Sequence, residues 1–202
     1  MNHIMIKTTK KQLFLLIHIM IKWSFIQNLP MKTIRKLLIS TALLFPIAMI
    51  VVNYVFSLSN YPASFMESQL SFSGIVIKSH YAVMSQYEIN IYKLAQLVDY
   101  VYLFIYGLFI FSLCIYLGRK LNKHKFIYKS SNMIASAGIL AATYDAIENG
   151  FILLMASHPK TFLNIYAIIH SAFASIKFIL LALSIIWILI SLLIFIIEQR
   201  RN

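Results

Sequence analysis

The chain carries the sequence TYDAIEN at residues 143–149, in the middle of an apolar segment that runs from about residue 131 to 156. A carboxylate at the centre of a lipid bilayer costs about 3 kcal/mol on insertion scales, so intramembrane acids normally face the interior of a bundle and take a partner there. Asp145, Glu148 and Asn149 are spaced at i, i+3 and i+4, which places them on one face of one helix. This spacing predicts that the functional site lies beside that face.

Composition places the chain among integral membrane proteins. Of its 202 residues, 60% are hydrophobic and 12% are charged, and the mean hydropathy is +0.79, which is outside the range of soluble domains. The net charge of +12 would suit a nucleic-acid binder, but the basic residues gather at the ends of apolar segments. We therefore predict a lipid bilayer, and no nucleic acid, as the partner of this chain.

Motifs that bind cofactors or metals are missing from the sequence. Glycine-rich phosphate loops, HExxH and CxxC do not occur, so nucleotide-binding and zinc-hydrolase functions lack their usual anchors. The single cysteine, Cys114, has no partner for a disulfide. Asp99, Glu148 and His170 are acceptable metal-ligand types, but they have no recognisable spacing. We predict no cofactor and no metal site, and the sequence identifies no catalytic residue.

Four segments are long and apolar enough to cross a hydrocarbon core about 30 Å thick, since a helix rises 1.5 Å per residue. They cover about residues 37–57, 97–117, 131–156 and 166–197. The predicted fold class is all-α, a polytopic membrane protein with a four-transmembrane-helix bundle over residues 31–202. Pro46 is expected to kink the first span. A cleaved signal sequence is the alternative for that span, although its apolar run exceeds the usual length.

Two segments lie outside these spans. Residues 1–30 hold an apolar run too short to span, so they form either an N-terminal extension before a true start at Met31 or an interfacial segment; we favour the extension. Residues 58–95 begin with Asn, Pro, Ser and Gly residues that are typical of loops and turns. The pattern from Ser85 to Glu88, S-x-x-E, predicts a capping box and a helix that continues into the second span.

Basic residues predict the orientation. Seven Lys or Arg precede the first span, five lie in the 118–130 loop and two close the chain, whereas three fall on the opposite side. The positive-inside rule then makes both termini cytoplasmic and residues 58–95 extracytoplasmic. We expect the membrane to be a bacterial inner membrane, with an organellar membrane as the alternative.

The spans bring polar groups together in the outer half of the bundle. Counting inward at 1.5 Å per residue puts Asp145 and Lys177 at the same depth, about 16 Å from the outer end of their spans, so we predict that they pair. A single lysine cannot neutralise two acids, which makes Glu148 a candidate proton carrier or ligand contact, unless Tyr144 and Asn149 satisfy its hydrogen bonds. The candidate ligand-binding or proton-relay residues are Asp145, Glu148, Asn149, Lys177, His170 and Asp99.

Four spans with acids on their inner walls resemble the architecture of the EXPERA-type sterol isomerases and the sigma-2 receptor. In those proteins intramembrane acids meet a lipophilic amine or a sterol. The resemblance is one of architecture, and no functional residue is carried over from it.

We expect the protein to bind a lipophilic or small polar ligand, or to relay a proton, through this cavity. Two other functions stay open. In the first, the chain is a non-catalytic subunit or interaction protein with a membrane partner or a second copy, and its buried charges only fix helix packing. In the second, it is an intramembrane enzyme with Glu148 as acid or base and His170 as its partner.

Overall fold

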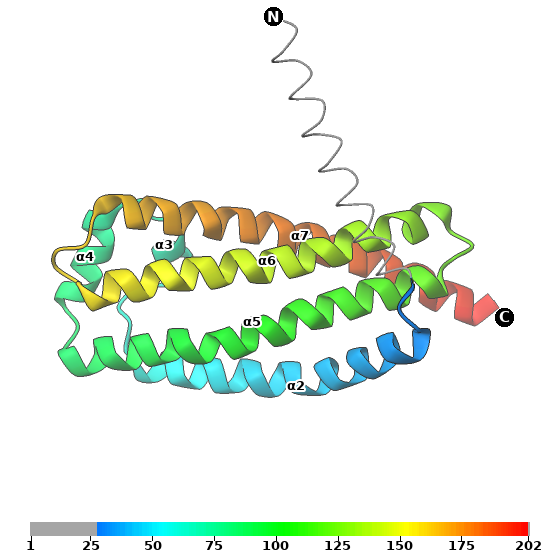
Figure 1. Ribbon diagram of the computed structural model, residues 1–202, viewed down its shortest axis with the longest axis horizontal. Coiled ribbons are helices and arrows are strands. Elements are labelled where there is room, and N and C mark those ends of the chain that lie inside the picture. The colour runs from blue at the N-terminus through cyan, green and yellow to red at the C-terminus, as the bar shows by residue number, and fades with distance from the viewer. Residues whose placement is uncertain (1–27, 202) are drawn as a thin grey trace, which may run out of the picture.

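The computed structural model describes residues 28–201, and its elements are helices joined by turns (Figure 1). The long helices are α2 (Met31–Leu58), α5 (Gln86–Lys120), α6 (Lys125–Ser157) and α7 (Asn164–Arg201), and the short ones are α3 (Phe65–Gln69) and α4 (Gly74–Ala82). The four long helices are candidate membrane spans by length and composition. The predicted all-α, four-helix membrane bundle is confirmed, and the interpretations of residues 1–27 lie outside the described residues.

Helix α5 starts as its sequence predicts. The Ser85 side chain accepts a hydrogen bond from the backbone N–H of Glu88, and the Glu88 carboxylate accepts one from the backbone N–H of Ser85. This reciprocal capping box satisfies two N–H groups that the helix itself leaves unpaired. The helix then continues unbroken for 35 residues, because no proline or helix-breaking cluster interrupts it.

The interpretation of residues 60–74 as loop and turn is wrong in part, because α3 lies inside this stretch and α4 begins at its end. The cause is local. Ser64 and Ser73 each accept a hydrogen bond from the backbone N–H three residues later, at Glu67 and Val76 respectively. Ser64 and Glu67 even share the S-x-x-E spacing that predicts the start of α5. Two short helices therefore form where the serine content suggests turns.

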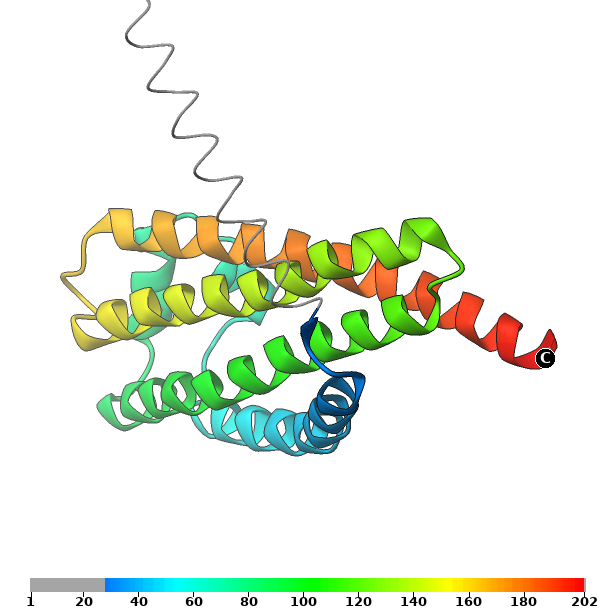
Figure 2. The same cartoon turned by 45° about the vertical axis from the view of Figure 1, so that its right-hand side comes forward.

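The long helices form an open arc. Helix α2 packs on α5, α5 packs on α6, α6 packs on α7, and α7 also contacts α5, whereas no comparably extensive contact joins α2 to α7. The start of α2, the α5–α6 turn and the end of α7 lie at one end of the bundle (Figure 1). The other end carries α3, α4 and the α6–α7 turn, and both short helices pack on α7 (Figures 1 and 2).

The seam between α5 and α6 is the tightest in the bundle. A Cβ atom built on Gly138 of α6 would overlap Ile110 of α5, and one built on Gly118 of α5 would overlap Ser131 of α6. Small residues on the third span therefore allow close helix approach, as is common in membrane bundles. By contrast, α2 buries only Ile34, Thr41 and Val52, so most of its apolar surface is left for lipid.

Candidate functional site

Lys177 of α7 holds two carboxylates of α6. Its Nζ atom lies 2.9 Å from Oδ1 of Asp145 and 2.6 Å from Oε2 of Glu148. The predicted Asp145–Lys177 pair is confirmed, and the same ammonium also contacts Glu148. Because the two acids are three residues apart on one helical face, a single side chain from the neighbouring helix reaches both. All three side chains are buried.

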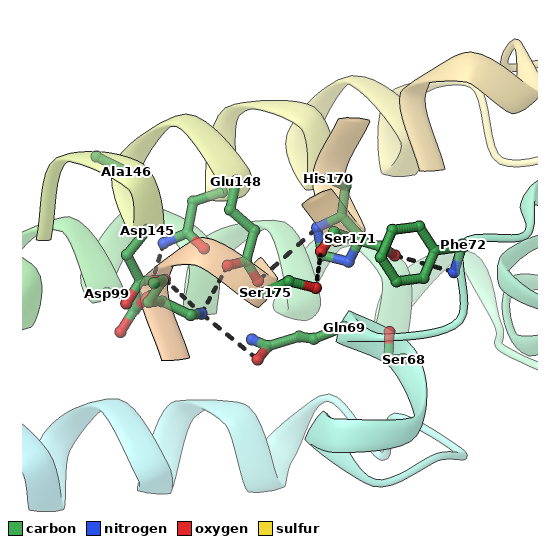
Figure 3. Close-up of polar contacts among 12 residues, drawn as sticks. Ser68, Gln69, Phe72, Asp99, Asp145, Ala146, Glu148, His170, Ser171 and Ser175 are labelled. Atoms are coloured by element: carbon green, nitrogen blue, oxygen red, sulfur yellow. Dashed lines mark hydrogen bonds and ion pairs between the residues drawn. The ribbon is translucent and has the colours of Figure 1, made fainter. Parts of the chain in front are cut away.

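Glu148 and His170 form the closed side of this cluster. Glu148 is 0% exposed and His170 of α7 is 1% exposed. Figure 3 shows the two side chains pointing toward each other, with Nδ1 of His170 lying 3.8 Å from Oε1 of Glu148. That distance is too long for a hydrogen bond. Packing of α7 on α6 covers Glu148, and Glu148 lines neither of the two cavities that Asp145 and Lys177 line.

Helix α5 supplies the other partners of the α6 face. The Asn149 side-chain amide donates a hydrogen bond of 2.7 Å to Oδ2 of Asp99. The hydroxyl group of Tyr106 donates one of 3.1 Å to Oδ2 of Asp145. The helices thus bring all six predicted site residues into one polar cluster, in which Asn149, the residue after Glu148 on α6, is bonded to Asp99 of α5.

Three further polar residues belong to this cluster and are not among the six predicted site residues. Lys177 Nζ donates a 3.4 Å hydrogen bond to Oε1 of Gln69, which ends helix α3. Tyr106 donates its hydrogen bond to Asp145, and Gln96, which is 3% exposed, lines the same cavity as Asp99. For Tyr106 and Gln96 a signal was present, since Asp99, Tyr102 and Tyr106 share one face of α5 and Gln96 lies three positions before Asp99.

Two cavities meet at the ion pair. The first, here the polar cavity, has a volume of about 350 Å³ and lies between α2, α3, α5, α6 and α7. The second, here the apolar cavity, has a volume of about 400 Å³ and lies between α2, α5 and α7. The residues that line both cavities are Tyr102, Asp145, Lys177 and Phe178. Asp145 and Lys177 are therefore accessible from either cavity, unlike Glu148.

The segment from Tyr61 to Gln69, which includes α3, closes the polar cavity at one end. The Tyr61 ring stacks on Tyr92 with centroids 4.5 Å apart, and its hydroxyl group is hydrogen bonded to Ser68 and His80 at 2.9 and 3.0 Å. Burial raises the pKa of Tyr61 to about 12, so this hydroxyl stays protonated at neutral pH. The segment from Tyr61 to Gln69 is thus an ordered part of the cavity wall.

The chain after α3 is tied to α7. Phe72 has a φ of 50°, a left-handed conformation that is uncommon for a bulky side chain. Its backbone N–H donates a 3.0 Å hydrogen bond to Oγ of Ser171, and the backbone N–H of Gly74 donates one of 2.6 Å to Oδ1 of Asn164. These bonds hold the segment after α3 against α7, and Figure 3 shows Phe72 beside Ser171.

The donor set of the cluster does not suit a metal ion. Within residues 28–201, no three His, Cys, Asp or Glu side chains are placed to hold one. The ammonium of Lys177 occupies the position between the two acids that a cation would take.

Comparisons of the chain with protein-family models, with characterised proteins and with solved structures gave no match. Function is therefore inferred from the site itself, which is the sounder basis even where a fold is shared.

Proposed function

We propose that this multi-pass membrane protein binds a lipophilic ligand in the joined cavities, in contact with Asp145 and Lys177. The observation that supports this function best is the position of the ion pair at the junction of a polar and an apolar cavity. Cavities that bind small organic ligands have volumes of about 300–1,000 Å³, mostly apolar walls and a few polar groups that fix orientation. The joined cavities have these properties.

A buried amide on the wall of the polar cavity supports the same function. Gln96 is 3% exposed, and its Oε1 atom has no hydrogen-bond partner within residues 28–201. Buried polar atoms normally have a partner, and an unpaired one costs about 1–3 kcal/mol. A donor group on a ligand would satisfy this oxygen.

Asp99 adds a charge that the ion pair does not need. Lys177 already contacts two carboxylates, and Asp99 on α5 provides a third acid on the cavity wall. Asp99 joins α5 to α6 through its hydrogen bond from Asn149, and as an acid that is costly to insert it also places negative charge on the cavity wall, where a donor group of a ligand could meet it. With the orientation predicted from the positive-inside rule, we place this polar cavity in the outer half of the bilayer.

Replacement of Gln96 by leucine tests this proposal. The two side chains have similar size, and the change removes a buried oxygen that has no partner, so the fold should lose little stability. Native mass spectrometry of the protein released from detergent micelles should detect small molecules bound to the wild type. We expect their occupancy to fall at least about fivefold in Gln96→Leu, since the loss of one hydrogen bond of ~1 kcal/mol has this effect.

The matched control is Gln86→Leu, the same substitution at an exposed position of α5. It should leave occupancy unchanged. If wild type, Gln96→Leu and Gln86→Leu carry equal amounts of bound small molecules, or none, the ligand-binding proposal is wrong. The alternative, in which the charges only fix helix packing, then takes its place.

A further inference from the structure

We infer that the ligand is a single-chain amphiphile whose head group donates hydrogen bonds, a long-chain amine or alcohol, and that it enters sideways from the bilayer between α2 and α7. The inference rests on the proposed function, which requires only that some lipophilic ligand occupies the joined cavities. It adds the direction of access, the position of the chain and the chemistry of the head group.

The route follows from the open arc of helices. Helices α2 and α7 make no extensive contact with each other, and both cavities are lined by residues of each helix and are not fully enclosed. On the polar cavity, Phe65 and Met66 of α3 are 51% and 55% exposed. On the apolar cavity, Ile185 and Leu189 of α7 are 52% and 61% exposed. Ile185 and Leu189 lie within α7, a candidate membrane span, so a lipid chain has direct access to the apolar cavity and, through it, to the ion pair.

The apolar cavity fits one chain. Its walls beyond the ion pair include Phe45 and Phe109, which stack with centroids 5.4 Å apart, and the aliphatic side chains Leu181 and Ile188. Its volume of about 400 Å³ lies at the low end of the range for small organic ligands, which suits one chain and not a two-chain lipid. The chain then runs along α7, away from the α3 end of the bundle.

The polar cavity favours a head group that donates hydrogen bonds. An ammonium has three donors, and Lys177 has three acceptors within reach: Asp145, Glu148 and Gln69. The side-chain amide of Asn149 donates a hydrogen bond to Oδ2 of Asp99, and that of Asn53 donates one to the backbone carbonyl of Met49.

Negative charge exceeds positive charge in this cluster, since Asp99, Asp145 and Glu148 face Lys177 alone. Oε1 of Gln96 has no partner within residues 28–201. A carboxylate or phosphate head would add negative charge beside Asp99 and Asp145, whereas an amine or hydroxyl group complements them. Charge complementarity and the unpaired oxygen favour the same head-group chemistry.

Photolabelling with three matched probes tests the inference. The probes are twelve-carbon chains with a diazirine at the tail and an amine, a hydroxyl or a carboxylate as the head. They are incorporated at equal bilayer concentration into nanodiscs that contain the full chain, and the labelled residues are mapped by mass spectrometry. We expect the amine and hydroxyl probes to label α2 and α7 near Phe45, Leu181 and Leu189, and the carboxylate probe to label them at least tenfold less.

Two variants fill the apolar cavity, and one serves as the control. Leu181→Trp and Ile188→Trp should each reduce labelling of α2 and α7 by the amine probe at least tenfold. Leu193→Trp introduces the same bulky side chain on α7 at a position that is 60% exposed and lines neither cavity, so it should label like the wild type. Use of two filling variants protects the test against one that fails to fold.

The outcomes separate the two proposals. If the carboxylate probe labels the cavity as strongly as the amine probe, the head-group assignment is wrong and the proposed function stands. Labels confined to the outer faces of α5 and α6 would overturn access between α2 and α7. Labelling by all three probes that neither filling variant reduces would overturn the inference and the proposed function together.

Discussion

Two carboxylates share Lys177, yet their surroundings differ. Glu148 is 0% exposed, lies between α6 and α7, and faces His170. Asp145 is 8% exposed, lines both cavities, and accepts a hydrogen bond from Tyr106. Less than one turn of one helix separates them. A shared cation therefore does not give two acids the same surroundings, because helix packing covers Glu148 and leaves Asp145 on the walls of both cavities.

Lys177→Met should have the largest effect on stability, because it removes the cation from both acids at once. Truncation of one partner of a buried ion pair costs about 3–5 kcal/mol, since the remaining charge is left without a partner. We expect a loss of this size in the free energy of unfolding, measured by circular dichroism in detergent micelles with increasing SDS.

The control for this prediction restores neutrality. The triple variant Lys177→Met, Asp145→Asn, Glu148→Gln removes all three charges of the ion set and leaves Asp99 with its hydrogen bond from Asn149. It should recover most of the lost stability, because replacing a whole buried ion set is often near neutral. Wild-type stability in Lys177→Met alone would show that the cluster is hydrated and not an ion pair.

Glu148→Gln and Asp145→Asn test the comparison of the two acids directly. Each substitution keeps the shape of the side chain and leaves Lys177 with one carboxylate. We expect Glu148→Gln to cost about 1–3 kcal/mol of stability, the usual effect of a weakened buried polar contact, with less than a twofold change in ligand occupancy. Asp145→Asn should cost less stability and reduce occupancy at least tenfold.

The reverse result would exchange the roles of the two acids. If Glu148→Gln loses the ligand and Asp145→Asn keeps it, Glu148 is the ligand contact or proton carrier that its sequence position first suggested. Stability measured by SDS unfolding and occupancy measured by native mass spectrometry must be taken on the same preparations, so that a binding loss is not mistaken for unfolding.

The sequence predicts the ion pair at the centre of the site, but it does not predict the arrangement of the helices around the cavities. The pairing of Asp145 with Lys177 is predictable, because the depth of a residue in a span depends only on the helical rise and an intramembrane charge needs a partner. The separation of α2 from α7 is not, because lipid-facing and helix-facing sides of a span are both apolar. Gln69 was missed because α3 is five residues long and is held by contacts with α7.

Gly138→Ala extends the comparison to the closed α5–α6 seam. The added Cβ would overlap Ile110, so we expect a loss of about 1–3 kcal/mol from overpacking, reduced by the higher helix propensity of alanine. Gly150→Ala is the matched control on the same helix, since its Cβ would meet only Oη of Tyr100 at 3.7 Å. It should be neutral or slightly stabilising in the same SDS unfolding measurement. Equal losses in both variants would contradict the close approach at Gly138.

The smallest effect is expected at the opposite end of the bundle, where His124 and Glu198 form a contact that is exposed to solvent. Nε2 of His124 is 2.9 Å from Oε1 of Glu198, a distance equal to that between Lys177 and Asp145, but the two side chains are 41% and 32% exposed. Exposed pairs contribute about 0–1 kcal/mol, because water solvates each charge when its partner is removed. Glu198→Gln should therefore change the free energy of unfolding by less than ~1 kcal/mol, and addition of salt should remove even this difference. A loss as large as that of Lys177→Met would mean that distance and not burial sets the strength of these pairs, and the contrast between Asp145 and Glu148 would lose its physical basis.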